Sequence, residues 1–172
     1  MTTIREPGPY VDVLKETELF AAFTEEELLR LVQACEKKTL APREPLWAVG
    51  SQGGAAFILI QGRVEQVQRL HPDGVRTYQF ERPGELLAVS YLVKGWEHQS
   101  AASALERTEL LRLDRQAFQA LFDAEEMAAY RLVDRIAEEV VQEMRDANGR
   151  LHEVFGNPAE TLRNLRRRVR QA

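Results

Sequence analysis

The sequence predicts an α+β fold: an antiparallel β-roll (a double-stranded β-helix, or jelly roll) flanked by N-terminal helices and a long C-terminal helix. Three observations support this. Apolar residues recur at helical spacings over residues 12–36, and they return to helical spacing after Asp114. Between these regions they come in short bursts separated by glycine, proline and polar residues. Many short strands joined by turn residues are typical of antiparallel sandwiches and barrels.

The N-terminal region predicts two helices. The first is expected to cover about Val11 to Glu18. The second should begin at Thr24, because Thr24 and Glu27 have the spacing of a capping box, in which each side chain bonds the backbone N–H of the other residue. Cys35 continues the apolar pattern, so we expect a small buried residue there rather than a nucleophile.

Five apolar bursts predict strands, and turn residues separate them. A tight hairpin is expected at Gln61-Gly62, and another at His71-Pro72-Asp73-Gly74, where Asp-Gly favours left-handed turn conformations. The bursts are residues 46–49, 56–60, 64–70, 75–80 and 110–113.

The remaining chain predicts helices. A short one should cover Arg115 to Phe122, and a long one residues 124–147, with Asn148-Gly149 as its stop signal. Pro158 is expected to open a last helix. We therefore expect one domain over residues 11–148 and a basic helical tail over residues 149–172.

Composition narrows the class of protein. Hydrophobic residues make up 44% and charged residues 29% of the 172 residues, which is ordinary for a globular domain. No apolar run approaches the about 20 residues of a membrane helix, and the N-terminus lacks the apolar segment of a signal peptide. Cys35 is the single cysteine, so no internal disulfide is possible and a cytoplasmic setting is expected. The net charge of −4 argues against broad nucleic-acid binding.

Nothing in the sequence predicts catalysis. The three histidines, His71, His98 and His152, are widely spaced, and common metal, nucleophile and phosphate-loop motifs are absent. A zinc site built from them and Cys35 is conceivable but has no spacing to support it. We expect no enzyme, no catalytic residue and no metal site.

The order of helices, β-roll and long helix resembles the cyclic nucleotide-binding domain family, as in the sensor domains of catabolite activator and Crp-Fnr-like proteins. The resemblance covers roughly Leu14 to Asn148 and rests on residues 44–50 and 56–64, which look like the family's apolar strand, glycine, and aromatic-apolar strand ending in x-Gly-x-Val. Gly50 and Gly62 fall at expected turns, where only glycine adopts a positive φ without steric strain.

The resemblance also implies a phosphate-binding cassette, in which the family has Phe-Gly-Glu, a short helix and Pro-Arg. Residues 83–85 match its opening turn, and the short helix then falls at residues 91–93. A gapless alignment puts Val89 where the family's Glu accepts the ribose 2′-OH and His98 where its Arg pairs with the cyclic phosphate. The candidate ligand-binding residues are Gly84, Glu85, Leu87, Ala88, Val89, His98, Gln99 and Ser100.

Two interpretations of this cassette stay open. In one it is degenerate and packed with Val89 and Leu92, so that cyclic nucleotide binding is weak, altered or lost. In the other, pocket N–H groups together with His98, Gln99 and Ser100 still bind cyclic AMP, cyclic GMP or another small anion. Losing two charged partners at about 1.5–3 kcal/mol each weakens binding by roughly two to four decades.

The long helix carries an apolar heptad seam. In the family that it resembles, this helix forms the dimer interface, so we predict a homodimer; the alternative is that the seam packs on the N-terminal helices. A second stripe (Ala129, Leu132, Ile136 and Val141) is expected to cover the roll. The predicted interface residues are Tyr130, Val133, Ala137, Val140, Met144 and Ala147.

The tail after Asn157 carries five arginines and one acid, Glu160. Residues 151–165 look similar to the hinge and first helix of the activators' winged DNA-binding domain, but the recognition helix is missing, so we expect no specific DNA binding from this chain alone. The leading hypothesis is a non-enzymatic regulatory module for signal transduction. The alternative is a truncated Crp/Fnr-type transcriptional regulator that contacts DNA only through a partner.

Overall fold

The computed structural model describes residues 2–70, 74–93 and 95–155. The chain divides into two compact units, residues 1–133 and residues 134–172. The first unit holds the helices and strands that form the roll, and it is described first.

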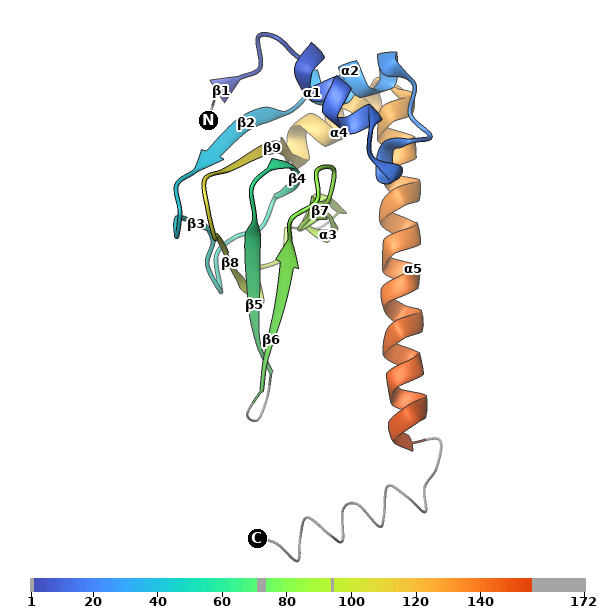
Figure 1. Ribbon diagram of the computed structural model, residues 1–172. Helices are drawn as coiled ribbons and strands as arrows, with labels where there is room; N and C mark the ends of the chain where they lie inside the picture. The colour runs from blue at the N-terminus through green and yellow to red at the C-terminus, as the bar shows by residue number, and fades with distance from the viewer. Residues whose placement is uncertain (1, 71–73, 94, 156–172) are drawn as a thin grey trace, which may run out of the picture. The chain divides into compact units, whose positions relative to one another are not determined.

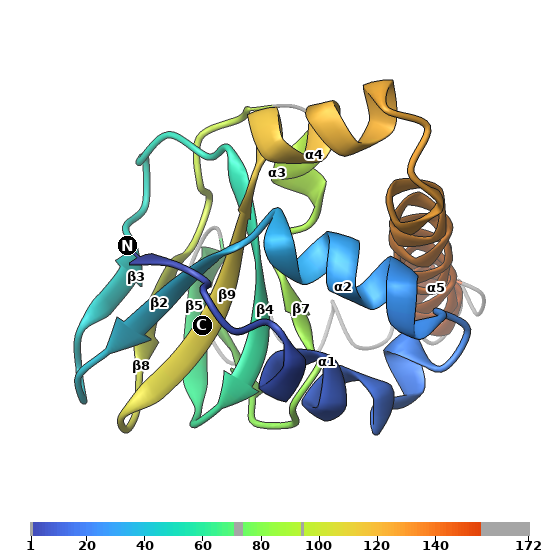
Figure 2. The same ribbon diagram turned by 90° about the horizontal axis from the view of Figure 1, so that it is seen from above.

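The N-terminal helices lie beside the five-stranded sheet (Figure 2). They are α1 (Gly8–Lys15), the 3-10 helix η1 (Glu18–Phe20) and α2 (Glu25–Gln33), and β1 (Thr2–Thr3), which precedes them, is a strand of that sheet. The capping box is confirmed: the Glu27 carboxylate accepts from the Thr24 N–H at 2.7 Å, and Thr24 Oγ1 accepts from the Glu27 N–H at 3.3 Å. Helix α1 begins three residues earlier than predicted, because proline is well placed in the first turn of a helix.

Two antiparallel sheets form the roll (Figure 1), which confirms the predicted fold class. The five-stranded sheet has the order β1-β2-β9-β4-β7, and the four-stranded sheet has the order β3-β8-β5-β6. The strands after β1 are β2 (Glu36–Leu40), β3 (Pro45–Trp47), β4 (Ala55–Gln61), β5 (Val64–Leu70), β6 (Gly74–Phe80), β7 (Leu86–Leu87), β8 (Ala101–Ala104) and β9 (Thr108–Asp114).

One predicted hairpin is wrong. Strand β4 pairs with β7 and β9, whereas β5 pairs with β6 and β8, so Gln61-Gly62 joins two different sheets. Residues 55–60 are buried throughout, which is typical of a strand covered on both faces. Gly62 turns the corner with φ +96°, and a Cβ there would lie 2.6 Å from the Arg107 carbonyl oxygen. The predicted pairing of β5 with β6 is confirmed, although residues 71–73 of its turn lie outside the described residues.

The main core lies between the sheets. Short, apolar side chains from β4, β8 and β9 surround two aromatic rings, those of Trp47 and Phe57. The cluster comprises Leu40, Trp47, Ala55, Phe57, Leu59, Val64, Leu87, Ala102, Ala104 and Leu110. Strand β6 forms one edge of its sheet, and its residues 75–79 are exposed on both faces.

The helices after the roll differ from the prediction at two ends. Helix α4 (Arg115–Asp123) begins as predicted, with Asp114 Oδ1 accepting from the Ala117 N–H at 2.8 Å. Helix α5 (Met127–Phe155) starts later than residue 124, because Ala124 caps α4 and Glu125 has φ +55°. It also continues through Gly149, where a stop was predicted; one interior glycine costs a helix only about 1 kcal/mol.

Residue 149, where the basic tail was predicted to begin, therefore lies inside α5, and the division into a domain and a tail stays a prediction. The predicted last helix from Pro158 and the arginine cluster lie outside the described residues. None of the helices in the described part of the chain is long and apolar enough to span a membrane.

Candidate functional site

The segment predicted to be the cassette runs from Gly84 through β7 and α3 (Ser90–Val93) to β8. Its opening turn is fastened to β4: the Gly84 N–H donates to the Leu59 carbonyl at 2.7 Å, and the Leu59 N–H donates to the Glu85 carbonyl at 2.9 Å. Gly84 has φ +85°, and a Cβ there would lie 2.7 Å from Thr17 Oγ1. This glycine therefore allows a close approach between the cassette and the N-terminal helices.

Glu85 is engaged within its own turn. Its carboxylate accepts from the backbone N–H groups of Glu81 and Arg82 at 2.8 and 3.0 Å, and from the Arg82 guanidinium at 2.9 and 3.0 Å. These contacts close the turn before β7 and neutralise both charges. Glu85 therefore has its bonding partners within its own turn, and its role toward a ligand stays a prediction.

Ala88 keeps a glycine-like backbone. It has φ +60°, and it stands where the resemblance puts the family's glycine. A non-glycine residue in this region costs roughly 1–2 kcal/mol, so surrounding contacts hold the backbone in that conformation. Leu87 is buried in the core, Val89 is half-buried, and Leu92 of α3 is buried.

His98 lies inside a stack of aromatic rings. Its side chain is only 4% exposed, and its ring centroid lies 4.8 Å from that of Trp47 and 4.1 Å from that of Tyr91. Phe57 extends the stack beyond Trp47, with centroids 5.8 Å apart. Burial lowers the pKa of His98, so the imidazole is neutral at pH 7. Its Nδ1 atom is buried and has no hydrogen-bond partner among the described residues.

Backbone hydrogen bonds hold His98 in this position. Its N–H donates to the Ser51 carbonyl at 2.9 Å, and its carbonyl accepts from the Gly50 N–H at 2.8 Å. The Gly53 N–H donates to the Trp96 carbonyl at 2.9 Å, and a Cβ on Gly53 would lie 2.2 Å from the Tyr91 ring. The loop between β3 and β4 is thus packed directly on the end of the cassette.

The other predicted residues divide between interior and surface. Ser100 is buried, and its Oγ accepts from Gln66 Nε2 at 3.0 Å and from Trp47 Nε1 at 3.5 Å. Gln99 is exposed, and its amide donates to the Glu97 carbonyl. His98 and Ser100 therefore both contact Trp47, through its ring and its Nε1 atom. Glu85 and Gln99 bond to other residues instead. Trp47 was not among the predicted site residues, although an inward-facing aromatic in a predicted strand was a signal for such a role.

A cavity of about 430 Å³ lies against this ring stack. Residues 51–54 of the loop before β4 line it, together with Trp47, Ala55, Phe57, His98 and Arg112. The Arg112 guanidinium is paired, because its Nη1 lies 3.2 Å from Glu36 Oε2 and 3.4 Å from Asp114 Oδ2.

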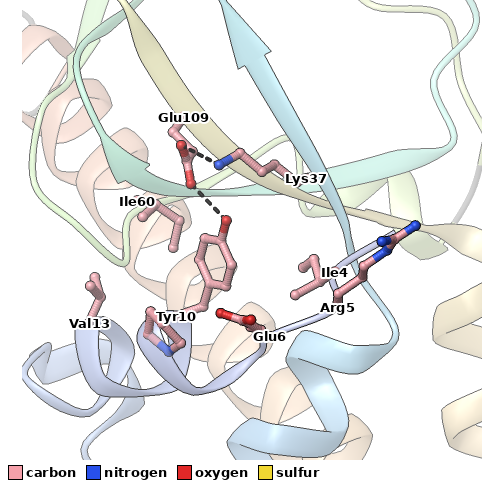
Figure 3. Close-up of a pocket in the computed structure, with 9 residues that line it drawn as sticks. Ile4, Arg5, Glu6, Tyr10, Val13, Lys37, Ile60 and Glu109 are labelled. Atoms are coloured by element: carbon pink, nitrogen blue, oxygen red, sulfur yellow. Dashed lines mark hydrogen bonds and ion pairs between the residues drawn. The ribbon is translucent and has the colours of Figure 1, made fainter. Parts of the chain in front are cut away.

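A second hollow, of about 470 Å³, lies between α1, β2 and the N-terminal segment (Figure 3). Three of its polar side chains bond one another: Glu109 accepts from the Tyr10 hydroxyl at 2.9 Å and pairs with Lys37 Nζ at 2.8 Å. The hydrogen bond to Glu109 is the main cause that raises the pKa of Lys37. The rest of the lining combines the charged residues Arg5 and Glu6 with apolar ones, Val13 and Ile60 among them.

The described residues hold no gathering of three or more His, Cys, Asp and Glu side chains that fits a metal ion. His71 and the side chain of His152 lie outside them. Cys35 is buried, and burial raises the pKa of its thiol to about 12. At neutral pH this thiol is protonated, as expected of a small core residue rather than a nucleophile.

The predicted seam lies on α5. Five of its six side chains are described and all five are exposed, with Met144 at 60%; the side chain of Ala147 is outside the described set. Of the second stripe, Ala129, Leu132 and Ile136 are buried, whereas Val141 is exposed. The dimer remains a prediction, and the exposed seam is the surface it requires.

Comparison with known proteins adds to this geometry. A family model described as "cyclic nucleotide-binding domain" matches residues 37–125. The cyclic AMP receptor protein of Thermus thermophilus is 29% identical over 125 residues, which is 72% of this chain and 57% of that protein. This chain thus spans less than two thirds of that relative's length.

Solved structures share the fold. The crystal structure of the Thermus thermophilus catabolite activator protein matches with a TM-score of 0.71 and 24% identity, over 80% of this chain and 63% of that one. The regulatory subunit of a cAMP-independent protein kinase A from Trypanosoma brucei matches with a TM-score of 0.66 and 18% identity, over 81% of this chain and 48% of that one.

Proposed function

The chain belongs to the cyclic nucleotide-binding domain family, and from this premise we propose that it is a non-enzymatic regulatory module whose cassette binds cyclic nucleotides weakly or not at all. One observation carries the proposal. The position that the resemblance assigns to the phosphate-binding arginine holds His98, which is buried, neutral, stacked on Trp47 and in ring contact with Tyr91.

Charge explains the expected loss of affinity. A cyclic phosphate is an anion, and its strong protein partners are cationic donors. The buried polar side chains of the described residues are those of His98, Ser100 and Thr108, and none of them carries a positive charge at pH 7. Arg82, the arginine at the opening turn, is already paired with Glu85. Val89 offers no acceptor for a ribose hydroxyl.

A structural neighbour supports the idea that this fold can work without such binding. The Trypanosoma brucei protein is named as the regulatory subunit of a cAMP-independent kinase. By analogy, we propose that the present domain transmits its signal through a different ligand or through protein contacts.

Isothermal titration calorimetry with cyclic AMP, cyclic GMP and cyclic di-GMP tests this function. Two lost charged partners shift a micromolar site to about 0.1–10 mM, so we expect no heat of binding at micromolar concentrations. The Thermus thermophilus cyclic AMP receptor protein serves as the positive control for the ligand. Binding of any of the three at micromolar or tighter Kd overturns the proposal.

We also propose a homodimer through α5. The exposed seam recurs at spacings of three and four residues, which is the repeat of a two-stranded coiled coil, and the helix has 29 residues. In sedimentation equilibrium, Met144→Glu should convert the dimer to a monomer. Val141→Glu makes the same change at an exposed valine next to the seam and should leave the dimer intact. A wild-type monomer at high micromolar concentration contradicts this proposal.

A second candidate is a regulator of the catabolite activator type that reaches DNA through a partner. The likeness to the Thermus thermophilus proteins favours it, because they match over most of this chain. Both candidates expect no specific DNA binding by this chain alone. Specific binding in a gel-shift assay with duplex DNA at physiological salt would therefore contradict both.

A further inference from the structure

Strand β6 is a long sheet edge without the usual protection. It ends the four-stranded sheet, and its seven residues pair with β5 without a register shift. The free backbone N–H and C=O groups of such an edge can pair with another strand, and proteins commonly prevent this by short length, proline, a bulge or charged side chains. Strand β6 contains no proline and one charged residue, Arg76.

The other sheet edges do have this protection. In the five-stranded sheet the edge strands β1 and β7 have two residues each. In the four-stranded sheet the opposite edge is β3, which has three residues, begins with Pro45 and shifts its register against β8. Within residues 2–70, 74–93 and 95–155, β6 is therefore the edge open to a further strand.

The bonds at the end of β5 show which backbone groups of β6 point outward. The Leu105 N–H donates to the Arg63 carbonyl at 2.8 Å, so Arg63 bonds toward the β8 side. Successive residues of a strand bond to opposite sides, so the even-numbered residues of β5 bond toward β6, where the register pairs them with even-numbered residues. The odd-numbered residues Val75, Thr77 and Gln79 therefore direct their N–H and C=O groups away from the sheet.

The outer half of the β5–β6 hairpin is a two-stranded ribbon. Strand β8 pairs with residues 64–67 of β5, and the ribbon extends beyond it (Figure 1). Residues 75–79 are exposed, with Val75 at 65%. An isolated two-stranded ribbon is marginally stable in water, and a third strand stabilises it. A strand added along β6 would supply this stabilisation.

The side chains beside this edge carry positive charge that awaits a partner. Arg76 Nη1 donates to the Tyr78 hydroxyl at 3.1 Å, and its guanidinium lies 6.0 Å from the centre of that ring. Among the described side chains no carboxylate forms an ion pair with Arg76, or with Arg69, which lies opposite Val75 on β5. A carboxylate on an added strand would complete a charge-assisted hydrogen bond with Arg76.

A second copy of β6 does not supply this carboxylate. In an antiparallel pair related by a two-fold axis, outward residues pair with outward residues, so Arg76 always faces an even-numbered residue of the other copy. None of the candidates is acidic: they are Gly74, Arg76, Tyr78, Phe80 and Arg82. The charge therefore favours a different chain.

We propose that β6 binds an extended segment of a partner protein, which adds a fifth strand to this sheet and places an acidic residue opposite Arg76. Main-chain hydrogen bonds to Val75, Thr77 and Gln79 hold the segment, as in other complexes formed by strand addition. β-branched or aromatic residues suit its positions opposite Val75 and Thr77. The binding itself does not depend on the proposed function, whereas the idea that this contact transmits the signal of the regulatory module does rest on it.

Selection from a phage-displayed library tests the edge with the full chain as the target. The library holds random peptides of about 12 residues, more than the about 5–6 residues of an ordinary strand. Selected peptides should contain an acidic residue within an alternation of β-branched or aromatic residues. Fluorescence anisotropy of the labelled peptides then measures their Kd.

Two substitutions of Thr77 test the backbone contact. Thr77→Pro removes an outward N–H while the bonds to β5 remain, and proline is tolerated in an edge strand at such a position. Loss of this hydrogen bond should weaken peptide binding about tenfold. The matched control Thr77→Val keeps the N–H and should bind within about twofold of the wild type.

A charge exchange tests the acidic residue, and it remains decisive if Thr77→Pro fails to fold. Arg76→Glu should weaken the selected peptide about fivefold, and replacing the acid of the peptide with lysine should restore binding to this variant. Hydrogen exchange gives a second readout on the wild type. Peptide binding should slow the exchange of the Val75, Thr77 and Gln79 amides.

Several results overturn the inference. They are the absence of selected peptides, equal binding by Thr77→Pro and Thr77→Val, and binding that ignores the charge exchange. Self-association that Thr77→Pro lowers in sedimentation would assign the edge to a second copy and also overturn it. Micromolar binding of cyclic AMP refutes the proposed function alone and leaves the edge to be judged by the peptides.

Discussion

Replacing His98 with phenylalanine should stabilise the protein. The imidazole is 4% exposed and stacked on two rings, and its Nδ1 lacks a hydrogen-bond partner among the described residues. A buried polar atom left unpaired costs about 1–3 kcal/mol. Phenylalanine keeps an aromatic ring in the stack and removes that polar atom, at a packing cost of about 1 kcal/mol for its larger ring. We expect a net gain of about 1 kcal/mol in the free energy of unfolding at pH 8.

The gain should increase as the pH falls. Burial lowers the pKa of His98 in the folded protein below its ordinary value of 6.5. The unfolded chain therefore takes up a proton first, and the wild type loses stability as the pH falls below that value. His98→Phe removes this proton uptake, so its advantage over the wild type should be larger at pH 5 than at pH 8.

Urea unfolding at pH 8 and pH 5, followed by circular dichroism, measures both effects. Tyr91→Phe is the matched control, because it keeps a ring beside His98 and leaves the imidazole to titrate. Its stability relative to the wild type should not depend on pH. An advantage of His98→Phe that stays constant or shrinks between pH 8 and pH 5 would refute the argument that a neutral, buried imidazole fills the stack.

Three further predictions use the same unfolding assay or a simple chemical probe. Gly53→Ala should lower the free energy of unfolding by about 1–3 kcal/mol, because its Cβ would meet the Tyr91 ring at 2.2 Å. Gly54→Ala has open space around its Cβ and should leave the stability unchanged or raise it slightly. Equal effects of the two substitutions would contradict the close packing of this loop on Tyr91. Thr24→Ala should lower the free energy of unfolding by about 1 kcal/mol, because it removes the N-cap of α2. An unchanged free energy of unfolding would mean that the capping box contributes nothing to stability. Cys35 should resist a thiol reagent at pH 8 in the native state and react in urea, because burial raises its pKa to about 12; fast native reaction would show that the thiol is accessible.

Most of the fold was predictable because its signals are local. The capping box at Thr24, the alternating bursts and the long apolar seam each depend on residues a few positions apart. The sequence did not predict that β4 and β5 belong to different sheets, because strand pairing depends on segments far apart in the chain. Strand β4, for example, lies between β7 and β9 in its sheet. A two-residue connection looks the same whether it closes a hairpin or turns a corner.

Four strands, β1, β2, β7 and β8, lie outside the five predicted bursts, and the first two show a related cause. Strand β2 has the sequence Glu-Lys-Lys-Thr-Leu, which carries little apolar alternation, and its place is decided by pairing with β9. Strand β1 has two residues and pairs with β2. Neither segment has a local strand signal, so the sheet edge could be found only from the three-dimensional structure.

The candidate site also has a part that the sequence predicts and a part that it does not. Alignment with the family identified the position of His98 and the loss of charge at Val89, since both follow from residue identity. The partners of His98 come from β3 and α3, and nothing in the local sequence pairs Trp47 with Tyr91 across 44 positions. The engagement of Glu85 by Arg82 was not predicted either, although the i,i+3 spacing of the two charges is a local signal for such a pair.

These contacts change what can regulate the domain. The cassette is held at three points without any ligand: Gly84 bonds to Leu59, Tyr91 packs on Gly53, and His98 is stacked beside Trp47. A ligand shifts an equilibrium only by its difference in affinity for two states. If the proposed function holds, a phosphate bound at the cassette would have little ordering left to supply, because these contacts already hold its turn, its short helix and His98.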